Sequence, residues 1–133
     1  MDRRTLLKAL GAGAAAVVAP RAEARAAPRR IALGDYPVAG FQYHDGMDPD
    51  VARELAEGER LAVVREPQNP YDELALALRT RGGAMIGYVP RYANTAPSTI
   101  ADQGIALSAE IVEWSRAAPP WERAVVRLYL EVG

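Results

Sequence analysis

A cluster of polar side chains on a short proline-framed segment is the part of this sequence best suited to binding chemistry. Residues 65–72 read Arg-Glu-Pro-Gln-Asn-Pro-Tyr-Asp. The two prolines exclude a helix and hold the backbone extended or turned. Asn69, Tyr71 and Asp72 thus lie on a stiff loop, a common position for a binding site. The same residues also suit a plain turn between strands, because Asn and Asp side chains bond nearby backbone amides.

The sequence offers few groups for enzymatic or metal-binding chemistry. It contains no cysteine, which excludes disulfides, thiolate zinc sites and thiol nucleophiles. His44 is the single histidine, so we interpret it as a half-buried strand residue rather than a metal ligand or catalytic base. Motifs of phosphate-binding loops, zinc proteases and serine hydrolases are missing. We therefore expect a protein that is not an enzyme and that carries no cofactor and no metal.

Short strands are predicted to position the loop. Apolar or alternating stretches predict strands over 29–33 (continued by 38–44), 60–66, 74–79, 84–89, 107–111 and 126–132. Short helices are predicted over 48–57, with Asp48 as N-cap, and over 94–103, with Thr95 as N-cap. Gly40 predicts a bend or bulge, and Gly87 a bulge or a close backbone approach. This pattern predicts an all-β dominated fold: a small barrel or curled sheet of five to six strands with one or two short helices.

Residues 1–26 have the pattern of an export signal. Arg3-Arg4-Thr5-Leu6-Leu7-Lys8 resembles the twin-arginine motif. An uncharged run over 9–19 is too short to span a bilayer, and Ala24-Arg25-Ala26 offers a cleavage site. We expect an exported, periplasmic mature chain without stable membrane insertion. The alternative is an alanine-rich extension that stays in the cytoplasm.

The remaining chain is acidic and long enough for one domain. Without residues 1–26 it has 11 basic and 15 acidic side chains, a formal charge of −4. This balance lacks the broad basic surface of strong non-specific nucleic-acid binders, so any such binding must be local. We expect 27–35 to be a linker and first strand, and 36–133 to be the barrel domain.

Four pieces in a fixed order give the chain a family resemblance. They are residues 38–43 (Val-Ala-Gly-Phe-Gln-Tyr), 61–72, 86–91 (Ile-Gly-Tyr-Val-Pro-Arg) and 94–104. Together they resemble a HIRAN domain, the module at the N-terminus of certain DNA-repair helicase-like ATPases that in bacteria also occurs alone. The resemblance covers about 36–132. It implies an OB-like β-barrel that binds the 3′-hydroxyl end of single-stranded DNA.

The resemblance also implies a set of binding residues. Carried over position by position, they are Gln42, Tyr43, Asn69, Tyr71, Asp72, Tyr88 and Arg91. Tyrosine rings can stack on unpaired bases, a carboxylate can accept a hydrogen bond from a terminal hydroxyl, and an arginine can bind a phosphate. Gln42 stands where DNA-binding relatives carry a basic residue, and Tyr88 stands where some carry histidine.

Structural roles for the same residues stay open. Tyr71 can cap the barrel, Asp72 can bond loop amides, and Arg91 can pair with an acidic neighbour. An alternative function is also open: an exported envelope or adaptor module that uses the same barrel to bind a protein or a small molecule. The acidic charge, Gln42 and the export signal favour that alternative.

Overall fold

The computed structural model describes residues 29–132, and residues 30–131 form one compact unit. Its strands are β1 (Arg29–Pro37), β2 (Arg60–Glu66), β3 (Ala75–Arg79), β4 (Met85–Tyr88), β5 (Leu107–Trp114) and β6 (Ala124–Val132). The helices are α2 (Pro49–Ala52), α3 (Thr95–Asp102) and the 3-10 turns η1 (Phe41–Tyr43), η2 (Asp45–Met47), η3 (Arg91–Ala93) and η4 (Pro120–Glu122). The prediction of an all-β fold with a few short helices is confirmed. The predicted export signal lies outside the described residues.

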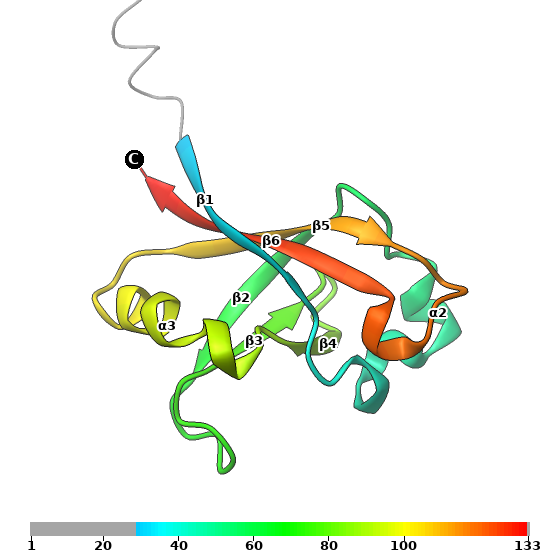
Figure 1. Cartoon of the computed structure of the whole chain (residues 1–133), viewed down its shortest axis with the longest axis horizontal. Coiled ribbons are helices and arrows are strands. Elements are labelled where there is room, and N and C mark those ends of the chain that lie inside the picture. Colours follow the sequence, from blue (N-terminus) through cyan, green and yellow to red (C-terminus); the bar gives the residue numbers. More distant parts are fainter. Residues whose placement is uncertain (1–28, 133) are drawn as a thin grey trace, which may run out of the picture. The chain divides into compact units, whose positions relative to one another are not determined.

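One sheet contains all these strands, in the order β1-β6-β5-β2-β3-β4. β2 pairs antiparallel with both β3 and β5, β3 with β4, and β5 with β6. The β2–β3 register ends at the pair Glu66 and Ala75, which fixes both ends of the loop over 67–74. In Figure 1 this loop projects from the sheet below β2 and β3.

Residues 38–39 connect β6, the second strand from one edge of the sheet, to β4 at the other edge. The Val38 amide donates to the carbonyl of Ala124 over 3.0 Å, and Ala39 exchanges two backbone hydrogen bonds with Tyr88, of 2.8 and 2.9 Å. Ala124 begins β6 and Tyr88 ends β4, so this short segment curls the sheet towards closure. Gly87 makes the approach possible, because a Cβ there would lie 2.5 Å from the Ala39 carbonyl oxygen. The close backbone approach predicted at Gly87 is confirmed.

The prediction of a strand over 38–44 is wrong beyond residue 39. Gly40 has φ of 74°, in the left-handed region, and the chain then turns through η1 and η2. Phe41 is fully buried, with its ring centroid 5.9 Å from that of Trp114. The alternating sequence matches a strand, but the glycine bend and the burial of Phe41 favour compact turns. As a result Tyr43 and His44 line the same groove instead of lying on opposite faces of a strand.

Strand β2 matches its predicted range, and most of the other predicted elements occur with shifted ends. β1 is unbroken where a break was expected over 34–37, and β5 continues to Trp114. α2 is shorter than predicted, although Asp48 caps it as expected by accepting a 2.8 Å hydrogen bond from the Asp50 amide. The N-cap of α3 is Asn94, not Thr95. No helix within residues 29–132 is long and apolar enough to cross a membrane.

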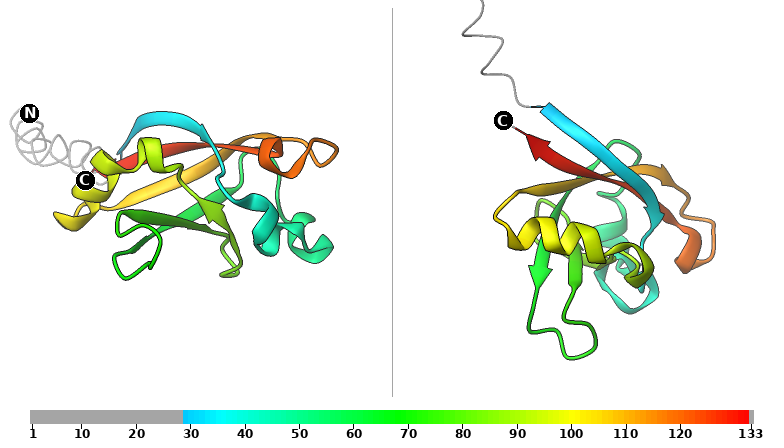
Figure 2. Two further views of the ribbon diagram at one scale, coloured as in Figure 1. Left: turned by 60° about the horizontal axis from the view of Figure 1, so that its bottom comes forward. Right: turned by 60° about the vertical axis from the view of Figure 1, so that its left-hand side comes forward.

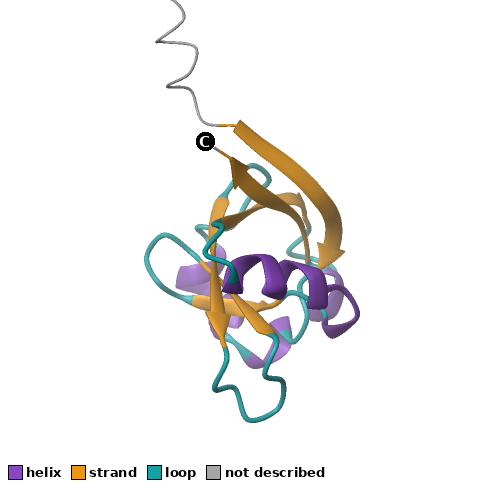
Figure 3. Ribbon diagram, turned by 90° about the vertical axis from the view of Figure 1, so that its left-hand side faces the viewer, coloured by secondary structure: helices purple, strands orange, loops and turns teal. Residues whose placement is uncertain are grey.

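The core lies inside the curled sheet, and α3 packs beside the strand ends. The largest fully buried side chains of the core are Phe41, Leu76, Leu78, Ile86, Ile111 and Leu128. β3 is buried on both faces over 75–78, as its sequence predicts. In β6, Val126 and Leu128 are buried, whereas Leu130 and Val132 are half-exposed because the strand extends past the core. Figures 2 and 3 show α3 lying close to the β2–β3 end of the sheet.

Candidate functional site

A groove of about 930 Å³ lies beside the loop over 67–74. Its walls come from three segments distant in the sequence: residues 39–44, residues 65–75 and residues 88–91. The first segment is the one that turns at Gly40, and the last follows directly from β4. The contact that closes the sheet, between Ala39 and Tyr88, therefore also brings the walls of the groove together.

The Asn69 side chain organises the loop from within. Its Oδ1 accepts hydrogen bonds from the backbone amides of Tyr71 (2.8 Å) and Asp72 (3.1 Å). Its Nδ2 donates to Glu66 Oε1 (3.1 Å) and to the Tyr88 hydroxyl (3.2 Å). Four hydrogen bonds from one amide make an Asx-type turn anchored to β4. The geometry assigns Asn69 to the shape of the loop, and this leaves little of its amide for a ligand.

A line of polar residues along α3 holds the outer side of the same loop. Asn94 donates to Asp72 Oδ2 (2.8 Å), and the Ser98 hydroxyl donates to the Leu74 carbonyl (2.6 Å). Asp102 receives a two-pronged ion pair from Arg65, at 3.0 and 3.2 Å. The three helix-side residues are four apart, so they face one direction on a helix. The α3 helix and its N-cap therefore anchor the loop at Asp72 and Leu74 and the end of β2 at Arg65.

The Asp72 carboxylate is fixed on both oxygens and still lines the groove. Oδ1 accepts from the Leu74 amide (3.0 Å) and Oδ2 from Asn94. Burial alone would raise the pKa of Asp72, but the hydrogen bonds from Leu74 and Asn94 and the nearby charge of Arg91 outweigh it, and the pKa is lowered. The carboxylate is thus kept ionised. Each of its oxygens retains a second acceptor site for a hydroxyl group.

Arg91 lies near this carboxylate but is far more exposed. Its Nε is 3.7 Å from Asp72 Oδ2, and its side chain is 79% exposed against 16% for Asp72. At this distance and exposure the pair contributes little to stability. Arg91 is therefore a solvated cation beside a recessed anion, which suits a phosphate outside and a hydroxyl inside. The other groove arginine, Arg65, is held by Asp102 and by backbone carbonyls of residues 73 and 75.

Two tyrosine rings stand open on the groove. Tyr43 is 80% exposed and Tyr71 is 87% exposed, and both line it. A folded protein gains little by exposing such large rings, whereas open aromatic faces can stack on planar ligands. Tyr71 does not cap the barrel. Its backbone is fixed by Asn69, so its position is set by the loop and its ring is left free.

Tyr88 forms part of the groove floor together with Glu66 and His44. The Tyr88 hydroxyl donates to Glu66 Oε1 over 2.9 Å, and burial together with that carboxylate raises the pKa of Tyr88. The His44 ring meets the Tyr88 ring edge to face, with centroids 5.6 Å apart. Tyr88 is therefore a hydrogen-bonded and packed residue, and its ring is less available for stacking than those of Tyr43 and Tyr71.

Six of the seven predicted site residues come together in this groove. They are Tyr43, Asn69, Tyr71, Asp72, Tyr88 and Arg91. Gln42 does not line it, and its side-chain oxygen is buried without a hydrogen-bond partner. Sequence reasoning left out Glu66, His44, Asn94, Ser98 and Asp102. The four-residue spacing of the last three is a signal in the sequence that could have indicated them.

Within residues 29–132, no group of three or more His, Asp or Glu side chains is arranged to hold a metal ion. The groove instead offers stacking faces, hydrogen-bond acceptors and one exposed cation. Such an arrangement has the groups needed to contact a planar ring, a hydroxyl and a negatively charged group.

Comparison with known proteins gives a family and a fold. The family model described as HIRAN domain matches residues 31–133. A crystal structure of a Lactobacillus plantarum protein aligns with a TM-score of 0.68 and 25% identity, covering 80% of this chain and all of that one. The HIRAN domain of human HLTF aligns with a TM-score of 0.60 and 18% identity, covering 77% of this chain and 79% of that one. A search of curated proteins found no match.

Proposed function

This chain belongs to the HIRAN domain family, and from that premise we propose that it is a nucleic-acid-binding module whose groove binds the 3′-hydroxyl end of single-stranded DNA. HIRAN is a DNA-binding domain, so family membership supports nucleic-acid binding. The family domain is not itself catalytic, and we propose no reaction for this chain.

One observation supports binding of a 3′-hydroxyl end in particular: two exposed tyrosine rings and one recessed carboxylate line the same groove. Tyr43 and Tyr71 are exposed, and Asp72 lies beside them with its side chain only 16% exposed. A base stacked on a tyrosine contributes about 1–3 kcal/mol to binding. The carboxylate can accept a hydrogen bond from a terminal hydroxyl and repels a terminal phosphate. This combination favours a strand end that carries a free hydroxyl over one that carries a phosphate, and we take it to be the 3′ end because the HIRAN family resemblance implies that end.

The distribution of charge supports an end rather than a continuous strand. The groove contains two arginines, Arg65 and Arg91, and two acids, Glu66 and Asp72, so it is not a basic channel. Arg65 is already paired with Asp102. A backbone running through the groove would bring its phosphates near both carboxylates. A terminal nucleoside avoids that contact and leaves one phosphate for Arg91.

A competition titration tests this proposal. The full chain is titrated against a fluorescent single strand with a free 3′ end, at low salt, and anisotropy is recorded. Unlabelled linear strand should displace the probe, whereas a circular single strand of the same composition should not. Equal displacement by the circular strand would contradict end binding and favour a non-specific electrostatic contact.

A second function is favoured by the charge of the chain. Residues 27–133 carry a formal charge of −4, and prolines, alanines and tyrosines make up much of the groove wall. An exported adaptor that binds a protein or a small molecule fits these features. Cell fractionation combined with the titration above separates the two: a periplasmic protein that binds no oligonucleotide at low salt supports the adaptor.

A further inference from the structure

Glu66 places a carboxylate in the groove, and the proposed function gives this carboxylate no direct contact with the ligand. It is the last residue of β2 and is half-buried at the base of the loop. Its Oε1 accepts hydrogen bonds from the Tyr88 hydroxyl (2.9 Å) and from Asn69 Nδ2 (3.1 Å). Two donors from different elements on a single oxygen fix the plane and direction of the carboxylate.

The second oxygen of this carboxylate is available. Within residues 29–132, Glu66 Oε2 accepts no hydrogen bond, because both donors bond Oε1. Glu66 Oε2 is also not one of the fully buried side-chain atoms that lack a partner in this part of the chain, which are one nitrogen of Arg30 and the oxygen of Gln42. Oε2 is therefore not fully buried, and it belongs to a residue that lines the groove. A held acceptor of this kind can discriminate between ligands, because it does not turn to suit each one.

We propose, resting on the end-binding function above, that Glu66 is a specificity-determining residue that accepts a hydrogen bond from the exocyclic amino group of the bound terminal base. A carboxylate accepting from the N4 amino group of cytosine is a known type of base contact. Thymine has a carbonyl oxygen at that position, and two acceptors facing each other repel. A strand ending in cytosine should therefore bind more tightly than one ending in thymine.

The geometry leaves the base as the part of the ligand that meets Glu66. Both Glu66 and Asp72 line the groove as acids, so phosphates are driven towards the exposed Arg91. Tyr43 and Tyr71 supply the stacking faces, which do not distinguish between bases. Sequence preference then depends on a group at the base edge, and Glu66 is the charged acceptor there with an unused oxygen.

The test compares matched pyrimidine ends on the full chain. Oligonucleotides with a free 3′-hydroxyl and terminal cytosine, thymine or pyrimidin-2-one are titrated by anisotropy. Pyrimidin-2-one is cytosine without its amino group. The wild type should bind the cytosine end about tenfold more tightly than either of the others. Ratios near one would overturn the proposal without any variant.

The substitution Glu66→Gln sharpens the result. The glutamine oxygen can accept from Tyr88 and Asn69 as the glutamate does, while its NH2 group replaces the open oxygen with a donor. The cytosine preference should disappear or turn into a thymine preference. Glu73→Gln, an exposed acid outside this groove in the same loop, should keep it. An unchanged preference in Glu66→Gln would overturn the proposal.

The outcomes separate this inference from the function on which it rests. If the wild type binds no oligonucleotide, the end-binding function fails and this inference fails with it. If the wild type binds all three ends equally, the function stands and the role of Glu66 fails alone. A thermal melt of each variant identifies any loss of folding, and the comparison of the three ends on wild type is unaffected by it.

Discussion

Asn94 donates a 2.8 Å hydrogen bond from Nδ2 to Oδ2 of Asp72, joining the start of α3 to the loop after β2. Asn94 is only 2% exposed. A buried amide that points at one carboxylate oxygen sets where that carboxylate faces. The acid expected to meet the 3′-hydroxyl is therefore positioned by a helix 22 residues away in the chain.

Asn94→Ala should destabilise the protein and weaken ligand binding. It removes a buried donor and leaves Asp72 with one fewer partner, which costs about 1–3 kcal/mol of unfolding free energy. Urea unfolding measures this. Thr99→Ala is the matched control on the same helix, because its hydroxyl bonds only the Thr95 carbonyl at the surface. Equal losses in the two variants would show that Asn94 has no special role.

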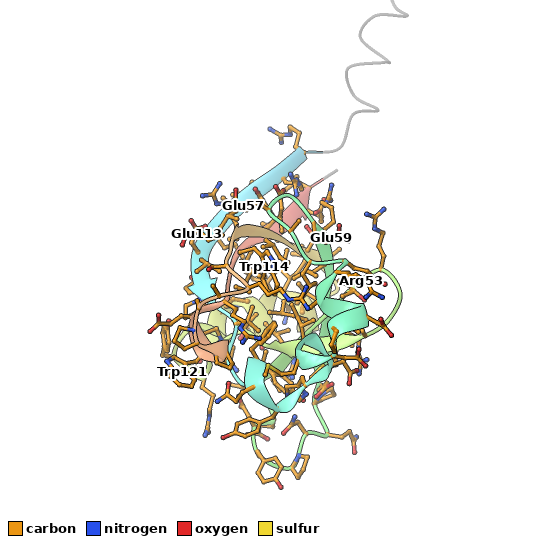
Figure 4. All side chains as sticks on the ribbon, turned by 90° about the vertical axis from the view of Figure 1, so that its right-hand side faces the viewer. Arg53, Glu57, Glu59, Glu113, Trp114 and Trp121 are labelled. Atoms are coloured by element: carbon orange, nitrogen blue, oxygen red, sulfur yellow. The ribbon has the colours of Figure 1, made fainter. Side chains whose placement is uncertain are left out.

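Tyr71→Ala should reduce affinity for single-stranded ends by about tenfold or more, since one stacked base is lost. Because Tyr71 is 87% exposed, the unfolding free energy should hardly change. Trp121→Ala is the control: it removes another exposed aromatic ring, one that does not line the groove. Figure 4 shows Trp121 at the edge of the molecule, whereas Trp114 lies among other side chains. A similar loss of affinity in both variants would contradict the assignment of the groove.

The lowered pKa of Asp72 predicts how stability changes with pH. A carboxyl whose folded pKa lies below its unfolded value stabilises the fold above that unfolded value, and the contribution is lost as the pH falls through the folded pKa. Asp72→Asn should therefore be less stable than wild type at about pH 7, and the difference should shrink towards about pH 3. Urea unfolding across this range measures it. A difference independent of pH would contradict the ionised, hydrogen-bonded carboxylate. The pKa of Asp35 is also lowered, by its hydrogen bond to Arg127, but Asp35 is present in both wild type and variant, so its contribution cancels in the difference.

Gly87→Ala should be strongly destabilising, by about 2–4 kcal/mol. Gly87 has φ of 147°, and a Cβ would come within 2.5 Å of both the Ala39 carbonyl oxygen and the Val38 side chain. Either the closing bridge between β4 and residue 39 breaks or the groove walls separate. Gly82→Ala is the control, because its Cβ would meet nothing closer than 3.8 Å. Thermal melting of both variants should show a large shift for Gly87→Ala alone.

Much of this architecture can be predicted from local sequence. β2 begins and ends where its apolar run predicts, the loop is framed by its prolines, and Gly87 marks the close approach. The sequence signal for each of these features lies within a few positions, although the backbone that approaches Gly87 is that of the distant Ala39. The segment after Ala39 was predicted wrongly because its alternation matches a strand, while the deciding factors were the left-handed Gly40 and the burial of Phe41 against Trp114, a tertiary contact.

The network of side-chain hydrogen bonds that shapes the groove was harder to predict from the sequence. The sequence predicts Asn69 as a ligand-binding residue, yet its side chain makes four hydrogen bonds that hold the loop. The contacts of Asn94 and Ser98 depend on how α3 lies against the residues just before β3, and no local sequence pattern predicts this tertiary arrangement. Glu66 sits in the motif itself, but its unused oxygen appears only once Tyr88 and Asn69 are seen to occupy the other.

The affinity of the full chain for two otherwise identical single strands, one ending in a 3′-hydroxyl and one in a 3′-phosphate, tests the central claim most directly. A recessed Asp72 carboxylate should favour the hydroxyl end by about tenfold or more, and Asp72→Asn should reduce that ratio. Equal affinity of the wild type for both strands would contradict the account.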